Sequence, residues 1–193
     1  MTASLHRLLA AAITGGGLLS AVAFFLPWVV VSCEETSSSG LVVAAEGAPT
    51  PAVGGDSMRL GSISPYERAT GIEFEATGAI RPMASPEGIG PDARYFALLV
   101  GAFLIVVLGG LASIATTLPL RPIGAAAFLT GGAALAATVV IGLEEHLGVN
   151  PGQFPGAILR AEAAWGLWLA VAGNSVATAG GLLTLLVGRR PAA

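Results

Sequence analysis

Four apolar stretches without a charged residue constrain this chain more than any other feature. They run over residues 8–31, 96–118, 123–143 and 163–187. A helix needs about 20 residues to cross the hydrocarbon core of a bilayer. In lipid, only a helix satisfies its own backbone polar groups over that length. The sequence therefore predicts an all-α membrane protein, a single membrane domain over residues 1–193 built as a four-transmembrane-helix bundle.

The composition agrees with a lipid-facing surface. Hydrophobic residues make up 54% of the chain and charged residues 11%, whereas a soluble domain carries about 25% charged residues. The sequence pI near 5.3 gives no basic surface for nucleic acid. The expected partners are membrane lipids and other membrane protein subunits, with no nucleic acid.

The charged residues predict the orientation of the helices. Residues 32–95 and 144–162 hold all 12 acidic residues and five of the nine arginines. The other four arginines lie at the opposite helix ends, where there is no acidic residue: Arg7, Arg121, Arg189 and Arg190. By the positive-inside rule, both termini are expected in the cytoplasm, in a multi-pass protein of the inner (cytoplasmic) membrane. The four-residue link at 119–122 predicts that the second and third helices are antiparallel neighbours.

The three tryptophans fit the same orientation. Trp28 ends the first apolar stretch, and Trp165 and Trp168 begin the fourth. Tryptophan gathers where the hydrocarbon core meets the headgroups. All three are therefore predicted to mark the outer membrane interface.

The first outer segment, residues 32–95, is predicted to form a small β-containing extracytoplasmic loop subdomain between the first two helices. Ile72, Phe74 and Ala76 alternate with polar residues, which is typical of a half-buried strand. Residues 59–63 are a candidate partner strand, and Val29-Val30-Val31 is another. Asp92 is a candidate N-cap for the second membrane helix, and the shorter second outer segment, 144–162, is turn-rich.

Cys33 is the only cysteine in the sequence. One cysteine excludes an internal disulfide and a zinc site built on several thiolates. Val30-Val31-Ser32-Cys33 is similar to a lipobox, the site at which a lipoprotein precursor is cleaved and lipidated. The apolar run before it has 24 residues, which is long for the apolar region of a signal peptide, and this favours a membrane helix.

Small residues recur at helical spacing in the fourth apolar stretch, at Gly173, Ala177 and Gly181. Such a face lets two helix backbones approach closely in a membrane. One interpretation is a docking face for another subunit, and the other is packing within this bundle. Asn174, the most polar side chain near a span centre, is expected to hydrogen-bond a neighbouring helix, with a ligand role as the alternative.

No ionisable residue lies within the four stretches, which argues against a pump or channel core because ion pathways use such residues. Glu144-Glu145-His146 follows the third stretch, and His146 is a candidate ligand for a metal or haem. Adjacent helical residues diverge by about 100°, so the three side chains do not converge on one ion. We therefore expect no cofactor, no metal site, no catalytic residues and no enzymatic activity.

Two segments carry a resemblance to known proteins. They are Pro-Trp-Val-Val-Val-Ser-Cys at 27–33 and Ser-Pro-Tyr-Glu-Arg-Ala-Thr-Gly at 64–71. Both resemble motifs of small bacterial multispanning membrane proteins of unassigned function, and this resemblance implies no activity. Four helices with a long, strand-bearing first outer loop also look like the claudin-type tetraspans. The chain lacks the tryptophan motif and the paired loop cysteines of that family.

The sequence therefore leads to one main functional hypothesis and two alternatives. The main one is a non-catalytic accessory or structural subunit of a larger bacterial membrane complex, respiratory or photosynthetic in kind, that acts by helix and loop docking. The first alternative is a self-associating, claudin-like tetraspan that binds an envelope partner. The second is a lipid- or small-molecule-handling membrane protein with Asn174 or His146 in a pocket.

Overall fold

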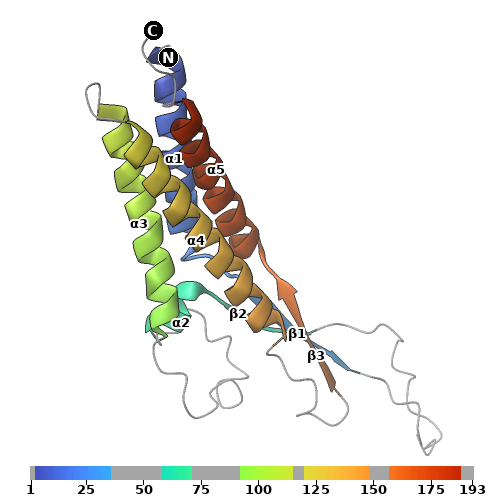
Figure 1. The fold of residues 1–193 in the computed structure, drawn as a ribbon. Coiled ribbons are helices and arrows are strands. Elements are labelled where there is room, and N and C mark those ends of the chain that lie inside the picture. Colours follow the sequence, from blue (N-terminus) through green and yellow to red (C-terminus); the bar gives the residue numbers. More distant parts are fainter. Residues whose placement is uncertain (1–2, 36–57, 71–91, 115–119, 148–156, 188–193) are drawn as a thin grey trace, which may run out of the picture.

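The computed structural model describes residues 3–35, 58–70, 92–114, 120–147 and 157–187. These residues form, in chain order, α1 (Ala3–Ala23), β1 (Val29–Glu35), β2 (Met58–Ile63), α2 (Pro65–Thr70), α3 (Ala93–Ile114), α4 (Leu120–Leu147), β3 (Ala157–Ala163) and α5 (Trp165–Val187) (Figure 1). Four of the helices, α1, α3, α4 and α5, are long and apolar enough to cross a membrane. The predicted four-helix bundle is confirmed at this level.

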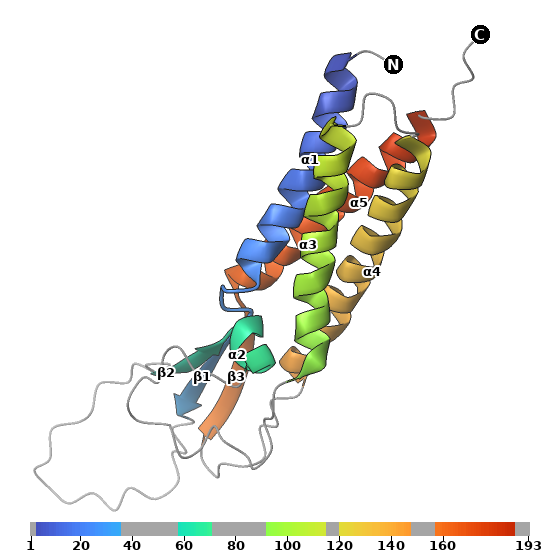
Figure 2. The same cartoon turned by 90° about the vertical axis from the view of Figure 1, so that its left-hand side faces the viewer.

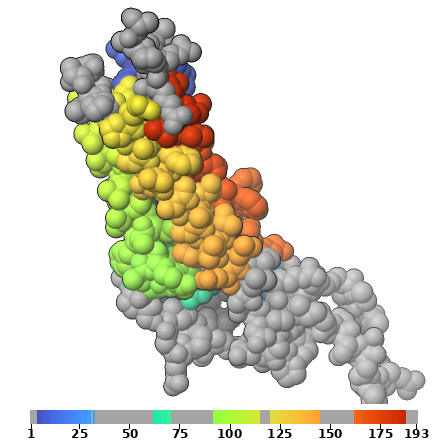
Figure 3. Space-filling view, in the orientation of Figure 1, coloured from blue at the N-terminus to red at the C-terminus, as the bar shows by residue number. Residues whose placement is uncertain are grey.

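The four long helices run up and down beside one another, and the strands lie beyond one end of the bundle (Figure 2). α1 begins and α5 ends at the opposite end (Figure 1). α1 packs against α3 and α5, while α4 packs against α5 and α3. The consecutive helices α3 and α4 are antiparallel neighbours, as the short link predicted, and Figure 3 shows them with α5 along one face of the bundle.

The first helix is shorter than predicted and ends before Pro27. α1 ends at Ala23, and the chain enters β1 at Val29. The carbonyl of Ala23, in the last helical turn, accepts from the indole N–H of Trp28 at 2.9 Å and from the backbone N–H of Leu26 at 3.2 Å. The prediction of a continuous helix to residue 31 was therefore wrong at this end.

The three strands form one antiparallel sheet in the order β2-β1-β3. Val29, the first residue of the central strand, pairs with Ile63 of β2 on one side and with Ala163 of β3 on the other. The predicted strands at 29–31 and 59–63 are thus present and paired. The β-structure is not confined to residues 32–95, because β3 comes from the second outer segment.

Two elements at this end, β3 and α2, were not predicted from the sequence. β3 reads Ala-Ile-Leu-Arg-Ala-Glu-Ala, a sequence rich in alanine, which has low strand propensity. Its pairing with β1 over seven residues supplies the strand conformation. Residues 65–70, which the predicted loop of β-structure included, form α2. The predicted strand around Ile72, Phe74 and Ala76 lies outside the described residues.

Glycines bring the helix backbones into contact along the bundle. A methyl group built on Gly16 of α1 would lie 2.5 Å from the carbonyl oxygen of Gly173 on α5. One built on Gly124 of α4 would lie 2.7 Å from the backbone nitrogen of Leu185 on α5. Real methyl groups do not approach that closely, so each of these positions accepts only glycine without a backbone shift.

We predict that Gly16→Ala lowers the free energy of unfolding by about 1–3 kcal/mol, because the added methyl overpacks the α1–α5 contact. Gly15→Ala is the matched control, since nothing lies within 4 Å of a methyl group at that position. The measurement is unfolding of the purified protein in mild detergent, followed by circular dichroism. Equal stability of the two variants would contradict the packing described here.

Candidate functional site

The helix bundle and the sheet meet in one apolar cluster, which we call the junction cluster. Its buried members come from α1, β1, α2, α3, α4, α5 and the turn after α1: Ala23, Phe24, Trp28, Val29, Ala69, Tyr95, Ile141 and Ala170. Each is at most 5% exposed. All four long helices are therefore tied to the sheet through one packed core.

Backbone hydrogen bonds join distant segments at the same place. The N–H of Trp28 donates to the carbonyl of Ile63 at 2.9 Å, and the N–H of Ala164 donates to the carbonyl of Trp28 at 2.8 Å. The N–H of Tyr66 donates to the carbonyl of Phe24 at 3.1 Å. The ends of α1, β2 and β3 are thus joined to one another, so the start of the sheet is tied to the bundle.

The Ser-Pro-Tyr-Glu segment at 64–67 starts α2 with a capping box. The hydroxyl of Ser64 accepts from the backbone N–H of Glu67 at 3.2 Å, and the Glu67 carboxylate accepts from the Ser64 N–H at 2.6 Å. Pro65 occupies the first helical position, where no N–H is needed. The motif that suggested a protein family therefore has a local structural role here, which is to place Ala69 in the junction cluster.

The tryptophans divide into two groups. Trp165 and Trp168 are 87% and 59% exposed at the start of α5, as expected of residues at a membrane interface. Trp28 is only 4% exposed and lies in the junction cluster. Its indole N–H donates to the carbonyl of Ala23, and the N–H of Ala164, next to Trp165, donates to the carbonyl of Trp28. That Trp28 marks the outer membrane interface stays a prediction.

The small residues of α5 are packed inside the bundle. Ala177 is fully buried, and a methyl group on Gly173 would lie 2.7 Å from the carbonyl oxygen of Gly16. Gly181 faces the backbone of Phe128 on α4. Of the two interpretations of this face, the structure shows packing within the bundle, because α1 and α4 occupy it.

Asn174 lies at the centre of a buried hydrogen-bonded chain that joins three helices. The hydroxyl of Ser20 on α1 donates to Asn174 Oδ1 at 2.8 Å, and Asn174 Nδ2 donates to Thr138 Oγ1 on α4 at 3.1 Å. Asn174 is 3% exposed. The structure therefore shows the interhelical role expected of it, and both of its polar atoms are used within the protein.

We predict that Asn174→Ala destabilises the bundle by about 1–2 kcal/mol, the range for hydrogen bonds between helices in lipid. Ser175→Ala, at the neighbouring exposed position, should leave stability unchanged. Both variants can be compared by unfolding in mixed detergent micelles. A loss of the same size in the two variants would show that the interhelical hydrogen bonds are not the cause.

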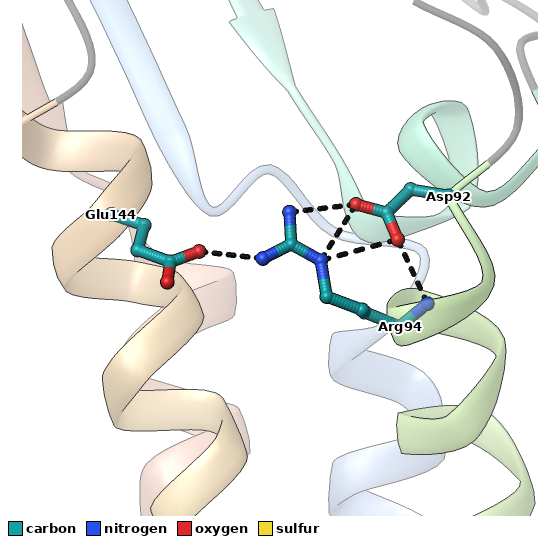
Figure 4. A network of polar contacts seen from close by, with 3 residues as sticks. All are labelled: Asp92, Arg94 and Glu144. Atoms are coloured by element: carbon teal, nitrogen blue, oxygen red, sulfur yellow. Dashed lines mark hydrogen bonds and ion pairs between the residues drawn. The ribbon is translucent and has the colours of Figure 1, made fainter.

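An exposed ion-paired group lies where α3 begins (Figure 4). Asp92 caps α3, because its Oδ1 accepts from the backbone N–H of Arg94 at 2.9 Å. The Arg94 guanidinium contacts Asp92 Oδ2 at 2.8 Å and Glu144 Oε2 of α4 at 2.7 Å. The predicted N-cap is confirmed. Its link to α4 through Arg94 was not predicted from the sequence.

Hydrogen bonds from Arg94 lower the pKa of the Asp92 carboxyl below its ordinary value of 3.8. A lowered folded-state pKa means that the carboxylate stabilises the fold above the unfolded pKa. That contribution is lost as the pH falls through the folded pKa. The cap is therefore fully effective at neutral pH.

We predict that Asp92→Ala destabilises the start of α3 by about 1 kcal/mol at pH 7, whereas Asp92→Asn keeps most of the capping effect. Amide hydrogen exchange of residues 93–97 measures both. The difference between wild type and Asp92→Ala should shrink at a pH well below 3.8, where the wild-type carboxyl is protonated. A difference that persists unchanged there would contradict the assigned role.

Among the described residues, histidine and acidic side chains are the ones that bear on a metal site. Within those residues, no group of three or more His, Cys, Asp or Glu side chains is placed to hold a metal ion. His146 lies in the last turn of α4, and its side chain is outside the described set. His6 of α1 contacts the carbonyl of Ala112 at 2.6 Å, near the C-terminal end of α3, where helix carbonyls lack partners.

No protein-family model, curated protein or solved structure matches this chain. The described residues define the protein at the level of its fold: four helices that are long and apolar enough to cross a membrane carry a three-stranded sheet at one end.

Proposed function

We propose that this protein is a non-catalytic integral membrane subunit of a larger bacterial membrane complex and that it docks through its sheet. In this proposal the sheet and α2 lie outside the cytoplasm, and both termini lie in the cytoplasm of an inner-membrane protein. The segregation of the acidic residues into the segments that carry the sheet supports this orientation.

One observation carries the proposal: the start of the sheet is packed and hydrogen-bonded against the ends of the apolar helices. The junction cluster packs all four long helices against it, and hydrogen bonds tie the start of the sheet to α1 and α5. A surface fixed in this way loses little conformational entropy when it binds, which favours recognition of a partner. Glu162 of β3 is exposed there.

The exposed faces of the helices are less suited than the sheet to docking another protein. The small residues that bring backbones together, such as Gly16, Gly173 and Gly181, are used between helices of this chain. The side chains that α3 and α4 expose are large and apolar; for example, Phe103 is 58% exposed and Leu129 is 67% exposed. Such surfaces suit lipid, which is as apolar as the side chains themselves.

A second candidate is a self-associating, claudin-like tetraspan. The observation that favours it is the composition of the sheet, in which β1 and β2 from the first outer segment pair with β3 from the second. A sheet shared by both outer segments is a surface that a second copy of the chain can recognise.

Site-specific photo-crosslinking in native membranes tests the proposal. We predict that a photoreactive residue at Glu162, exposed on β3, forms an adduct with another polypeptide. The same residue at Leu129, which is exposed in the span of α4, should form none. The mass of the adduct separates the two candidates, because self-association gives twice the mass of the chain.

The opposite pattern would overturn the proposal. Protein adducts from position 129 together with none from position 162 would place the docking surface on the helices. Lipid adducts alone from both positions would favour a protein that handles lipid, the remaining alternative.

A further inference from the structure

Large apolar side chains cover the outside of α3 over a defined length. The first near the sheet is Phe96 and the last is Ile114, which are 45% and 79% exposed. The 18 steps from residue 96 to residue 114 correspond to about 27 Å of helix at about 1.5 Å per residue. The hydrocarbon core of a bilayer is about 30 Å thick. The apolar surface of α3 therefore has the length that a bilayer core requires.

The junction cluster shows that this surface ends at a similar level on all four long helices. Its buried members include one residue directly after α1 and one residue from each of the other long helices: Phe24, Tyr95, Ile141 and Ala170. Within two positions of each in the sequence lies an exposed apolar side chain. These four exposed side chains, which we call the boundary ring, are Phe25, Phe96, Val140 and Trp168.

The boundary ring is rich in aromatic side chains. Trp168 is 59% exposed, and Trp165, one turn earlier on α5, is 87% exposed. Within the part of the chain that the structure describes, neither indole N–H has a hydrogen-bond partner, whereas that of Trp28 donates to Ala23. An indole has an apolar ring and one donor, so it is favoured where hydrocarbon meets the lipid headgroups.

Charged side chains lie directly beyond the ring. Arg94 precedes Phe96 by two residues on α3, and Glu144 follows Val140 by one turn on α4. These two charged side chains are 60% and 53% exposed and form an ion pair at 2.7 Å (Figure 4). A charged side chain in the hydrocarbon core is costly. The ion pair therefore limits the core on the side where the ring ends.

The arrangement of the ring indicates what covers it. Its members come from all four long helices, so exposed apolar side chains surround the bundle at this level. A bilayer contacts a helix bundle on every side, whereas a docked protein covers one side. The ring therefore fits a lipid surface better than it fits a protein partner.

We propose that the lipid headgroup layer meets the protein at the boundary ring. The hydrocarbon core then ends between Phe96 and Arg94 on α3 and between Val140 and Glu144 on α4. α2 and the start of β1 lie at the level of the headgroups, because Ala69 and Val29 belong to the same junction cluster. This inference does not depend on which side of the membrane the sheet occupies or on what docks on the sheet.

Tryptophan fluorescence in nanodiscs of brominated phosphatidylcholine tests the proposal, because bromine quenches a tryptophan at its own depth. One variant keeps Trp168 alone through Trp28→Phe and Trp165→Phe. The matched control adds Leu104→Trp, at an exposed position near the middle of α3, and removes Trp168 through Trp168→Phe. We expect Trp168 to lose more fluorescence to bromine near the headgroup end of the acyl chain than to bromine near its methyl end. The Leu104→Trp variant should show the reverse.

A second measurement leaves all three tryptophans in place, because Trp28→Phe changes a buried side chain. With Cys33→Ser, single spin labels are attached through Ala93→Cys, Phe96→Cys or Leu104→Cys, all at exposed positions of α3. Access of oxygen, which enters hydrocarbon, is compared with access of a water-soluble nickel chelate. We expect the ratio of oxygen to nickel access to be highest at position 104, lower at 96 and lowest at 93.

Two results would overturn the proposal. One is Trp168 fluorescence that is quenched at the same depth as in the Leu104→Trp variant, or by neither lipid. The other is a ratio of oxygen to nickel access at position 93 or 96 that equals the ratio at 104. Either result would move the headgroup layer away from the boundary ring, whatever the crosslinks from Glu162 show about docking.

Discussion

Close approach of helix backbones at glycine positions is the constraint on which the rest of this structure depends. Gly16, Gly173 and Gly181 let α1, α4 and α5 touch without intervening side chains. This closeness brings Ser20, Asn174 and Thr138 within hydrogen-bonding distance in the interior. In a bilayer, where apolar burial does not favour helix over lipid, such packing and such hydrogen bonds are what hold helices together.

The same packing determines which side chains of the bundle are left on its surface. Because the small faces of α1 and α5 are used internally, the bundle presents mostly large apolar side chains on its outside. Glu162, an exposed carboxylate, lies beyond the helix ends on β3. The junction cluster makes the sheet continuous with the bundle, so a partner bound to the sheet would also be tied to the helices.

The close backbone contacts are unevenly distributed among the helix interfaces. The α1–α5, α1–α3 and α4–α5 interfaces are held by glycine contacts with the neighbouring backbone. At the α3–α4 interface, a methyl group on Gly101 would meet the Cβ of Ala134 at 3.8 Å, an ordinary van der Waals distance. That interface is packed by apolar side chains, with Tyr95 and Ile141 buried in the junction cluster at its sheet end.

The sequence by itself determined the four helices, because uncharged apolar runs of this length have one stable conformation in lipid. It also determined the cap at Asp92 and the strands at 29–31 and 59–63, which follow from local patterns. The tertiary structure alone decided that β3 is a strand, since its hydrogen-bond partners come from β1, more than 100 residues away in the sequence. It also decided that Trp28 is buried and that Gly173 and Gly181 face this chain's own helices. A periodic pattern defines a face of a helix, and only the assembled fold shows what covers that face.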